Sequence, residues 1–424
     1  MNVVELYDIF KQSTGITTDS RNIAANNIFF ALKGTNFNGN LFAAEAIEKG
    51  ALLVVADEQH FAPNPKIAIV ENALQTMQQL ALFHRKKFKG KVIALTGSNG
   101  KTTTKELMAA VLATTYKTQA TKGNLNNHIG IPLTLLSMPE SIDFAIVEMG
   151  ANHQQEIHSY CQYVEPDFGL VTNVGLAHLE GFGGFEGVVK GKTELYRYLA
   201  ANGGKVFVNT DNDILLHQAK EAGFIASNLI TYGTAAPAFC EGKLQEGTFL
   251  TLAAAGETIH TNLVGNYNFE NALAACCTGK YFGVEFPKIK AALESYVPTN
   301  NRSQKIEQNG NTIILDCYNA NPSSMKAAIE SFANTAAQPR IAILGGMKEM
   351  GGSSARVHEE IAALAQAQQL EQVIFVGSEF EAANFGLKFL TTEAAINWLK
   401  AHPFSGANIL VKGSRAYKLE TLFL

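Results

Sequence analysis

A short apolar run, a glycine loop and a helical pattern follow one another within this chain and most constrain its fold. Residues 92–95 are apolar and rich in β-branched side chains, as in a buried strand. Residues 97–102 contain two glycines, a lysine and a threonine, and Leu107, Val111 and Leu112 then have helical spacing. In a strand–glycine turn–helix arrangement, backbone N–H groups of the turn point toward a bound anion, and the dipole of the helix favours its negative charge. This segment therefore predicts a phosphate-binding loop.

The loop is shorter than the common nucleotide-binding motif, because only Ser98 and Asn99 separate its two glycines. In the predicted loop, Lys101 reaches the outer phosphates and the Thr102 hydroxyl ligates a magnesium ion. The alternative is a glycine-rich turn whose lysine is merely solvated. The strand before the loop and the helix after it favour nucleotide binding.

Length and composition place the chain among globular proteins of several domains. It has 424 residues, of which 46% are hydrophobic and 17% charged, with a net charge of −4. This balance predicts no nucleic-acid partner. The five cysteines are scattered and odd in number, which favours a reducing compartment. The chain begins with no signal-peptide pattern and contains no membrane-spanning apolar run, so we expect a cytoplasmic protein without membrane insertion. We also expect a monomer.

Alternating strand and helix patterns predict an α/β protein of three domains, at 1–88, 89–298 and 299–424. The first is a small α/β domain, the second a mostly parallel sheet, and the third has a dinucleotide-fold topology. Between 235 and 263 short runs with glycine breaks predict a local antiparallel extension. The expected strands cover residues 27–32, 51–56, 92–95, 144–149, 169–174, 205–209, 312–315, 341–344, 373–376 and 409–411.

Two stretches join the predicted domains. Residues 84–91 are strongly basic, and we interpret them as a solvated helix end and linker because their flanks are not basic. Residues 297–302 are polar, contain Pro298 and interrupt the periodicity. We expect hinge motion near 88–91 and 297–301.

Polar residues at the ends of apolar strands are candidates for chemistry, since their burial is costly unless they act on something. Glu148 could hold a metal at nucleotide phosphates or be a structural carboxylate. His178 follows a strand that ends near Asn173, and it could be a ligand or a structural histidine. Asp316 ends another strand and could equally precede a helix start.

Other candidates are weaker by spacing alone. Lys192 reads as an ordinary surface lysine, together with Lys190. Asn268 and Asn271 lie one helical turn apart and could face one base or ribose. Two cations and a hydroxyl within residues 411–415 suit a carboxylate or phosphate, with a solvated C-terminus as the alternative.

The ordered set of these motifs resembles the Mur ligases of peptidoglycan synthesis. The resemblance rests on residues 96–103, 148–152, 172–178, 192–195 and 316–322. Within that family, residues 123–134, 318–325 and 411–415 resemble the branch that adds D-alanyl-D-alanine. The resemblance extends over all three predicted domains.

The resemblance implies an N-terminal domain for the UDP end of a substrate, a central P-loop ATPase domain and a C-terminal Rossmann-like acceptor domain. It implies an ATP-dependent amide ligase that joins D-alanyl-D-alanine to UDP-N-acetylmuramoyl-tripeptide through an acyl phosphate, with two magnesium ions. The implied catalytic residues are Lys101, Glu148, His178 and Lys192. The implied metal ligands are Thr102, Glu148, His178 and a carbamylated Lys192.

The resemblance also assigns three sets of binding residues. Those for ATP are Gly97, Ser98, Asn99, Gly100, Lys101, Thr102, Thr103, Asn268, Asn271, Arg302 and Asp316. Those for the UDP substrate are Ser20, Arg21, Lys33, Gly34, Asn126 and Asn127. Those for the acceptor are Asn319, Asn321, Lys412, Ser414 and Arg415.

The chain departs from the family pattern at three places. Gly346 stands where an aspartate is usual, Tyr267 stands where a histidine is usual, and residues 38–40 are Asn-Gly-Asn where Asp-Gly-His is more common. The alternative functions are a sister Mur ligase that adds a different amino acid, a folylpolyglutamate synthetase-like ligase, and a catalytically idle nucleotide-binding module.

Overall fold

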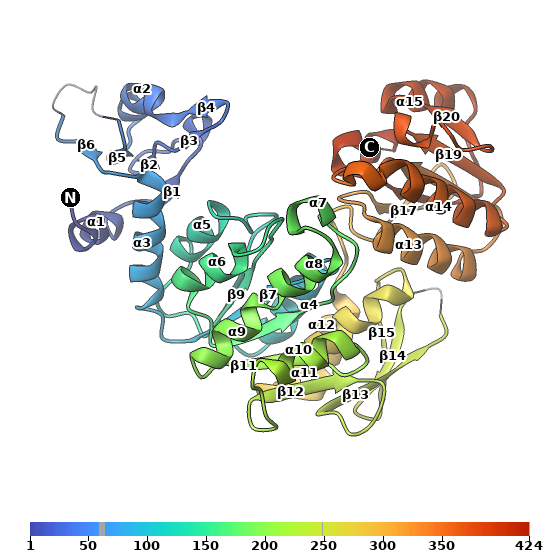
Figure 1. Ribbon diagram of the computed structural model, residues 1–424, viewed down its shortest axis with the longest axis horizontal. Helices are drawn as coiled ribbons and strands as arrows, with labels where there is room; N and C mark the ends of the chain where they lie inside the picture. The colour runs from blue at the N-terminus through green and yellow to red at the C-terminus, as the bar shows by residue number, and fades with distance from the viewer. Residues whose placement is uncertain (59–63, 248, 424) are drawn as a thin grey trace.

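The computed structural model describes residues 1–58, 64–247 and 249–423. It has three lobes that follow one another along the chain, each with its own sheet (Figure 1). The N-terminal lobe and the C-terminal lobe lie on opposite sides of the central lobe, and helix α3 leads from the first into the second (Figure 1). The predicted α/β class with mostly parallel sheets is confirmed.

The N-terminal lobe contains a parallel sheet of order β1-β2-β5-β6 and a small hairpin, β3-β4. Its strands are β1 (Ile16–Thr17), β2 (Ile28–Phe30), β3 (Lys33–Gly34), β4 (Phe37–Asn38), β5 (Leu53–Ala56) and β6 (Ile67–Ile69). Its helices are α1 (Val3–Phe10), η1 (Ser20–Asn22), η2 (Gly39–Phe42), α2 (Ala43–Glu48) and α3 (Ala73–Arg85).

The central lobe is built on a sheet of order β15-β14-β13-β12-β11-β10-β7-β9-β8. Neighbours from β8 to β13 are parallel and those from β13 to β15 antiparallel, which confirms the predicted antiparallel extension. The strands are β7 (Lys91–Thr96), β8 (Thr118–Ala120), β9 (Phe144–Glu148), β10 (Phe168–Val171), β11 (Lys205–Asn209), β12 (Leu229–Gly233), β13 (Cys240–Gln245), β14 (Thr251–Ala254) and β15 (Glu257–His260).

Helices cover both faces of this sheet. On β7, Val92 and Ala94 belong to one apolar cluster and Ile93 and Leu95 to another, because alternate residues of a strand face opposite sides. The helices are α4 (Lys101–Ala113), α5 (Gly130–Leu136), α6 (Glu156–Val164), α7 (Leu179–Phe182), α8 (Phe185–Lys192), α9 (Glu194–Ala201), α10 (Asp213–Glu221), η3 (Asn266–Asn268), α11 (Phe269–Tyr281) and α12 (Phe286–Ser295).

The C-terminal lobe has a sheet of order β16-β17-β21-β18-β19-β20, parallel except for β16. Its strands are β16 (Gln304–Gln308), β17 (Asn311–Asp316), β18 (Arg340–Gly345), β19 (Gln372–Val376), β20 (Leu387–Phe389) and β21 (Asn408–Lys412). Its helices are α13 (Pro322–Thr335), η4 (Gly351–Ser353), α14 (Ser354–Ala367), η5 (Ser378–Phe380), α15 (Thr392–Ala401), η6 (Arg415–Tyr417) and η7 (Leu419–Leu422).

The junction between the first two lobes corrects one sequence interpretation. Lys86 and Lys87 are exposed as expected, but His84 is buried between Tyr7 and the carbonyl of Met138. The Arg85 guanidinium donates to the Val164 carbonyl and pairs with Asp167 at 2.9 Å. The basic stretch is therefore partly a packed joint rather than a solvated linker, because tertiary contacts neutralise and desolvate two of its residues.

Candidate active site

The loop between β7 and α4 has the conformation that the glycines predict. Gly97 and Gly100 have φ values of 143° and 77°, in a region that favours glycine. A Cβ on Gly97 would lie 2.0 Å from Thr172 Oγ1, and one on Gly100 would lie 2.4 Å from Asn271 Oδ1. Both positions therefore exclude larger residues.

Residues beyond β10 hold this loop in place. The Asn99 N–H donates to Asn173 Oδ1 at 2.9 Å, and the Thr172 hydroxyl donates to the Asn99 carbonyl at 2.6 Å. The strand ends at Val171, two residues earlier than Asn173, and so leaves Asn173 free to reach across to the loop. The role that the sequence left open for Asn173 is thus to position the phosphate-binding loop.

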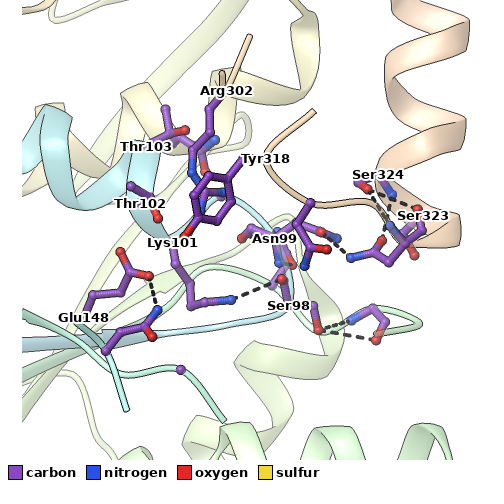
Figure 2. A pocket seen from close by; sticks show the side chains of 18 of the residues that line it. Ser98, Asn99, Lys101, Thr102, Thr103, Glu148, Arg302, Tyr318, Ser323 and Ser324 are labelled. Atoms are coloured by element: carbon purple, nitrogen blue, oxygen red, sulfur yellow. Dashed lines mark hydrogen bonds between the residues drawn. The ribbon is translucent and has the colours of Figure 1, made fainter. Parts of the chain in front are cut away.

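Lys101 begins helix α4 beneath the loop. Its Nζ donates to the carbonyls of Gly97 at 2.7 Å and Ser98 at 3.2 Å (Figure 2). Dehydration of the ammonium group lowers the pKa of Lys101 to about 8, against an opposing influence of the Glu148 carboxylate. An anion bound at the loop would restore the preference for the charged form.

A cavity of about 670 Å³ opens in front of the loop, between the central and C-terminal lobes. It brings together most of the predicted site residues. Those lining it are Ser98, Asn99, Gly100, Lys101, Thr102, Thr103, Asn126, Asn127, Glu148, His178, Asn268, Asn271, Arg302, Asp316, Asn319, Asn321 and Lys412. The predicted residues outside its lining are Ser20, Arg21, Lys33, Gly34, Gly97, Lys192, Ser414 and Arg415.

Glu148 ends β9 beside the start of the loop, in register with Leu95. Its side chain is buried, and its Oε1 accepts a hydrogen bond from Asn126 at 2.7 Å. Its Oε2 accepts no hydrogen bond from the described residues, and the nearest cation is Lys105 Nζ at 3.7 Å. A buried carboxylate oxygen without a hydrogen bond is costly, and it suits a hard cation such as Mg²⁺. Glu148 therefore fits the predicted role of metal ligand.

His178 lies across the cavity, just before α7, with a left-handed backbone of φ 54°. Burial lowers the pKa of its imidazole against an opposing influence of the Glu349 carboxylate, and the positive charges of Lys101 and Lys192 lower it further. Within the described residues, no group of three or more His, Cys, Asp or Glu side chains could hold a metal. A metal here would rely on the hydroxyl of Thr102 and on nucleotide oxygens besides Glu148 and His178.

Lys192 lies behind the cavity wall and corrects the interpretation made from spacing. Its side chain is only 1% exposed, whereas Lys190 is exposed as expected. The Lys192 ammonium donates to the Ala151 carbonyl at 2.8 Å and lies 4.9 Å from the centre of the Phe182 ring. Burial and the charge of Lys101 hold the pKa of Lys192 well below its ordinary value. Sequence spacing could not reveal this, because the packing of α8 against α6 and α7 decides it.

The far end of the cavity presents amide and aromatic groups. Asn271 Nδ2 donates to Asn268 Oδ1 at 2.9 Å, so the two amides do face one place. The Arg302 guanidinium lies 3.9 Å from the centre of the Tyr318 ring (Figure 2). Tyr267, at the position where a histidine is usual, bonds to Ser303 Oγ at 2.8 Å. The sequence reasoning missed Tyr318, although its place just after β17 is a signal that could have found it.

The acceptor candidates occupy the carboxyl edge of the C-terminal sheet. Lys412 is buried and pairs with Asp316 at 2.6 Å, since the two residues are in register on adjacent strands. Asn321 caps α13 and donates to Asn99 Oδ1 at 2.7 Å, which links the two lobes. Arg415 does not line the cavity, but its guanidinium donates at 3.1 Å to the hydroxyl of Tyr318, which does. The acceptor role of these residues stays a prediction.

The UDP candidates of the N-terminal lobe lie apart from the cavity. Arg21 donates three hydrogen bonds to the Asp19 carboxylate, two from its guanidinium and one from its backbone N–H, and these lower the pKa of that carboxyl to about 2. Lys33 pairs with Glu58 at 2.8 Å. Asn127 lines the cavity, but its side chain accepts from the N–H groups of Ile129 and Gly130 at the start of α5. Binding of the UDP end by this set stays a prediction.

Family models match all three lobes of the chain. They are described as "Mur ligase family, catalytic domain" at residues 12–88, "Mur ligase middle domain" at 95–279 and "Mur ligase, glutamate ligase domain" at 301–415. The UDP-N-acetylmuramoyl-tripeptide–D-alanyl-D-alanine ligase of Bacillus subtilis is 32% identical, over 96% of this chain and 92% of its own length. The chain belongs to the Mur ligase family. The matched ranges lie within the three predicted domains, whose boundaries stay a prediction.

Other relatives and solved structures agree with this membership. The Escherichia coli enzyme of the same name is 34% identical over 96% of this chain and 92% of its own length. A crystal structure of MurF from Acinetobacter baumannii has a TM-score of 0.86 at 30% identity, covering 96% of this chain and 92% of its own. The MurF ligase of Thermotoga maritima in complex with ADP has a TM-score of 0.85 at 26% identity, covering 98% and 97%.

For more distant structures, the likeness to this Mur ligase is one of fold only. A folylpolyglutamate synthase of Mycobacterium tuberculosis has a TM-score of 0.60 at 12% identity, and it covers 83% of this chain and 95% of its own. The alternative of a folylpolyglutamate synthetase-like ligase is therefore supported only by a likeness of fold. No helix in the part of the chain that the structure describes is long and apolar enough to cross a membrane.

Proposed function

We propose that this Mur ligase joins D-alanyl-D-alanine to UDP-N-acetylmuramoyl-tripeptide at the expense of ATP, in peptidoglycan precursor synthesis. The observation that carries the proposal is the cavity between two lobes. It combines a phosphate-binding loop, a buried carboxylate oxygen without a hydrogen bond and polar residues of the C-terminal lobe. Relatives that bear this activity in their names match 96% of the chain.

The chemistry must convert a carboxylate into a group that an amine can displace. The tripeptide carboxylate attacks the γ-phosphate of ATP, which forms an acyl phosphate and releases ADP. The amine of the dipeptide then attacks the acyl carbon, and phosphate leaves with its electron pair. Catalysis of phosphoryl transfer is mainly positioning and charge stabilisation.

The residues around the loop supply those two functions. Lys101 neutralises charge on the transferring group once it exchanges the loop carbonyls for phosphate oxygens. Thr102, Glu148 and His178 would hold Mg²⁺, which offsets phosphate charge when bound. We keep two magnesium ions, a cytoplasmic location and a monomeric state as predictions.

Lys192 is proposed to act as a carbamate. Its lowered pKa favours the neutral amine, which can attack CO₂; a nitrogen–carbon bond forms, the nitrogen loses a proton to solvent, and the neutral amine becomes an anionic carbamate. With ¹³C-bicarbonate, we expect a carbamate carbon signal in the wild type and in Lys190→Ala, but not in Lys192→Ala. A signal that survives in Lys192→Ala would remove this role.

The first experiment measures phosphate release from ATP and Mg²⁺ with the UDP-linked tripeptide, with and without D-alanyl-D-alanine. We expect release that needs both substrates, with a matching gain of mass in the product. Phosphate release with a different amino compound as acceptor, and not with D-alanyl-D-alanine, would favour a sister Mur ligase. Absence of release in every combination would favour an idle nucleotide-binding module.

A further inference from the structure

The C-terminal lobe contacts a predicted metal ligand of the central lobe. Glu349, in the loop after β18, forms a hydrogen bond through its Oε2 with Nδ1 of His178. His178 lines the cavity, whereas Glu349 does not. The hydrogen bond to His178 therefore gives Glu349 an indirect contact with the cavity.

The backbone at both ends of this contact is in an uncommon conformation. His178 has φ 54° and Glu349 has φ 63°, although neither is a glycine. A left-handed residue with a Cβ costs free energy and persists only where its surroundings fix it. The loops on both sides therefore fix the backbone at the two residues.

Neighbouring contacts also join the segment around α7 to the C-terminal lobe. The Leu176 N–H donates to Ser323 Oγ at 3.3 Å, across the boundary between the lobes. At Gly351 an added Cβ would lie 3.5 Å from the Glu180 carboxylate, so this glycine packs against α7. The Glu349–His178 bond is thus one part of a continuous interface between the loop after β18 and the segment around α7.

The bond fixes which imidazole nitrogen is free. An ionised carboxylate only accepts hydrogen bonds, so a neutral His178 carries its proton on Nδ1 and its lone pair on Nε2. Carboxylates that orient a metal-binding histidine in this way raise its basicity and fix its direction.

We propose that Glu349 is a positioning residue for His178, and that docking of the C-terminal lobe thereby completes the metal site. This inference rests on the proposed function, which supplies the magnesium and the nucleotide. It predicts that a residue outside the cavity, on another lobe, controls metal affinity. An effect that passes through His178 distinguishes this role from a merely structural latch.

The test uses Mn²⁺ as the probe, titrated by electron paramagnetic resonance into the full chain saturated with a non-hydrolysable ATP analogue. We expect Glu349→Ala to weaken Mn²⁺ binding by about 10- to 100-fold, the usual range for such partners. Glu349→Gln keeps an acceptor oxygen and should recover part of the loss. The matched control is Glu359→Ala, an exposed carboxylate on α14 of the same lobe, which should bind Mn²⁺ as the wild type does.

Measurements in a His178→Ala variant show whether Glu349 affects Mn²⁺ binding through His178. In His178→Ala, the further change Glu349→Ala should alter Mn²⁺ affinity less than twofold, because the residue through which it acts is gone. Unchanged Mn²⁺ affinity in the single variant, or an equal loss in both backgrounds, would overturn the proposal. Ligation by the wild type is measured separately, so its absence beside an intact Glu349 effect would count against the proposed function alone.

Discussion

The central and C-terminal sheets both have polar residues at their carboxyl edges, but the two sets of residues differ in how far they are paired with each other. At the central edge, Glu148 leaves one oxygen without a hydrogen bond, and Lys101 donates only to carbonyls of its own loop. At the C-terminal edge, charges meet each other: Lys412 pairs with Asp316 at 2.6 Å, and Lys348 pairs with Glu379. The central edge therefore has polar groups free to bind a ligand, whereas many charged groups of the C-terminal edge are paired with each other.

This difference indicates that the two edges have different functions within one cavity. Unsatisfied buried groups cost stability, and they are retained where a ligand supplies the missing partner. Internally paired groups fix a surface against which a substrate or a neighbouring lobe can be placed. We infer that the central edge handles phosphate and that the C-terminal edge mainly orients. At Gly346 an added Cβ would lie 2.5 Å from the Glu379 carboxylate, so an aspartate there would displace that side chain.

The largest expected effect tests the central edge. Lys101→Ala should lower the ligation rate by about 10³-fold or more, as expected for loss of a preorganised charge at the reacting group. The free energy of unfolding should hardly change, because the lysine bonds only to loop carbonyls. Steady-state kinetics and urea unfolding measure the two quantities, and Lys117→Ala, an exposed lysine of the same lobe, is the control. Turnover close to that of the wild type would remove Lys101 from the reaction.

The next effect tests the C-terminal edge through stability. Lys412→Met leaves the Asp316 charge unpaired, which should cost about 3–5 kcal/mol of unfolding free energy. The double variant with Asp316→Leu should recover much of this loss. Lys326→Met is the control, because its pair with Glu330 is exposed and loosely spaced at 3.9 Å; it should cost at most about 0.5 kcal/mol. A similar cost for both lysines in urea unfolding would contradict the contrast between the edges.

A smaller effect follows from the pKa of Lys101, which is about 8. ADP favours the charged lysine, so ADP affinity should be constant below pH 8 and fall by up to about tenfold per pH unit above it. The fall ends at the higher pKa that the bound anion gives to Lys101. Calorimetric titration without magnesium measures it, and Lys101→Met should lose the pH dependence. A flat profile in the wild type would mean that the ammonium is better hydrated than its contacts suggest.

Local sequence patterns predicted much of this molecule. The strand, glycine loop and helix at 91–113 follow from residue types and spacing, because backbone conformation there is decided locally. The burial of Lys192, the packing of His84 and the His178–Glu349 contact did not follow, because each depends on segments far apart in the chain. The resemblance to a family supplied a role for Lys192, and it supplied none for Glu349.

The smallest expected effect tests the link between the two edges at Asn321. This residue caps α13 through a hydrogen bond to the Ser324 N–H, and it also donates to Asn99 of the phosphate-binding loop. Asn321→Ala removes both contacts and should cost about 1 kcal/mol of stability for the cap. Asn321→Ser is the matched variant, because a serine caps as well as an asparagine but is too short to reach Asn99.

The two variants separate docking from folding. Asn321→Ser should unfold in urea like the wild type, yet weaken ADP binding by about two- to tenfold, the net value of one hydrogen bond that holds the loop. Asn321→Ala should show the same loss of ADP affinity together with the loss of stability. Unchanged ADP affinity in both variants would mean that the C-terminal edge leaves the phosphate loop unaffected. The two edges would then act independently, and the contrast between them would describe two sites rather than one.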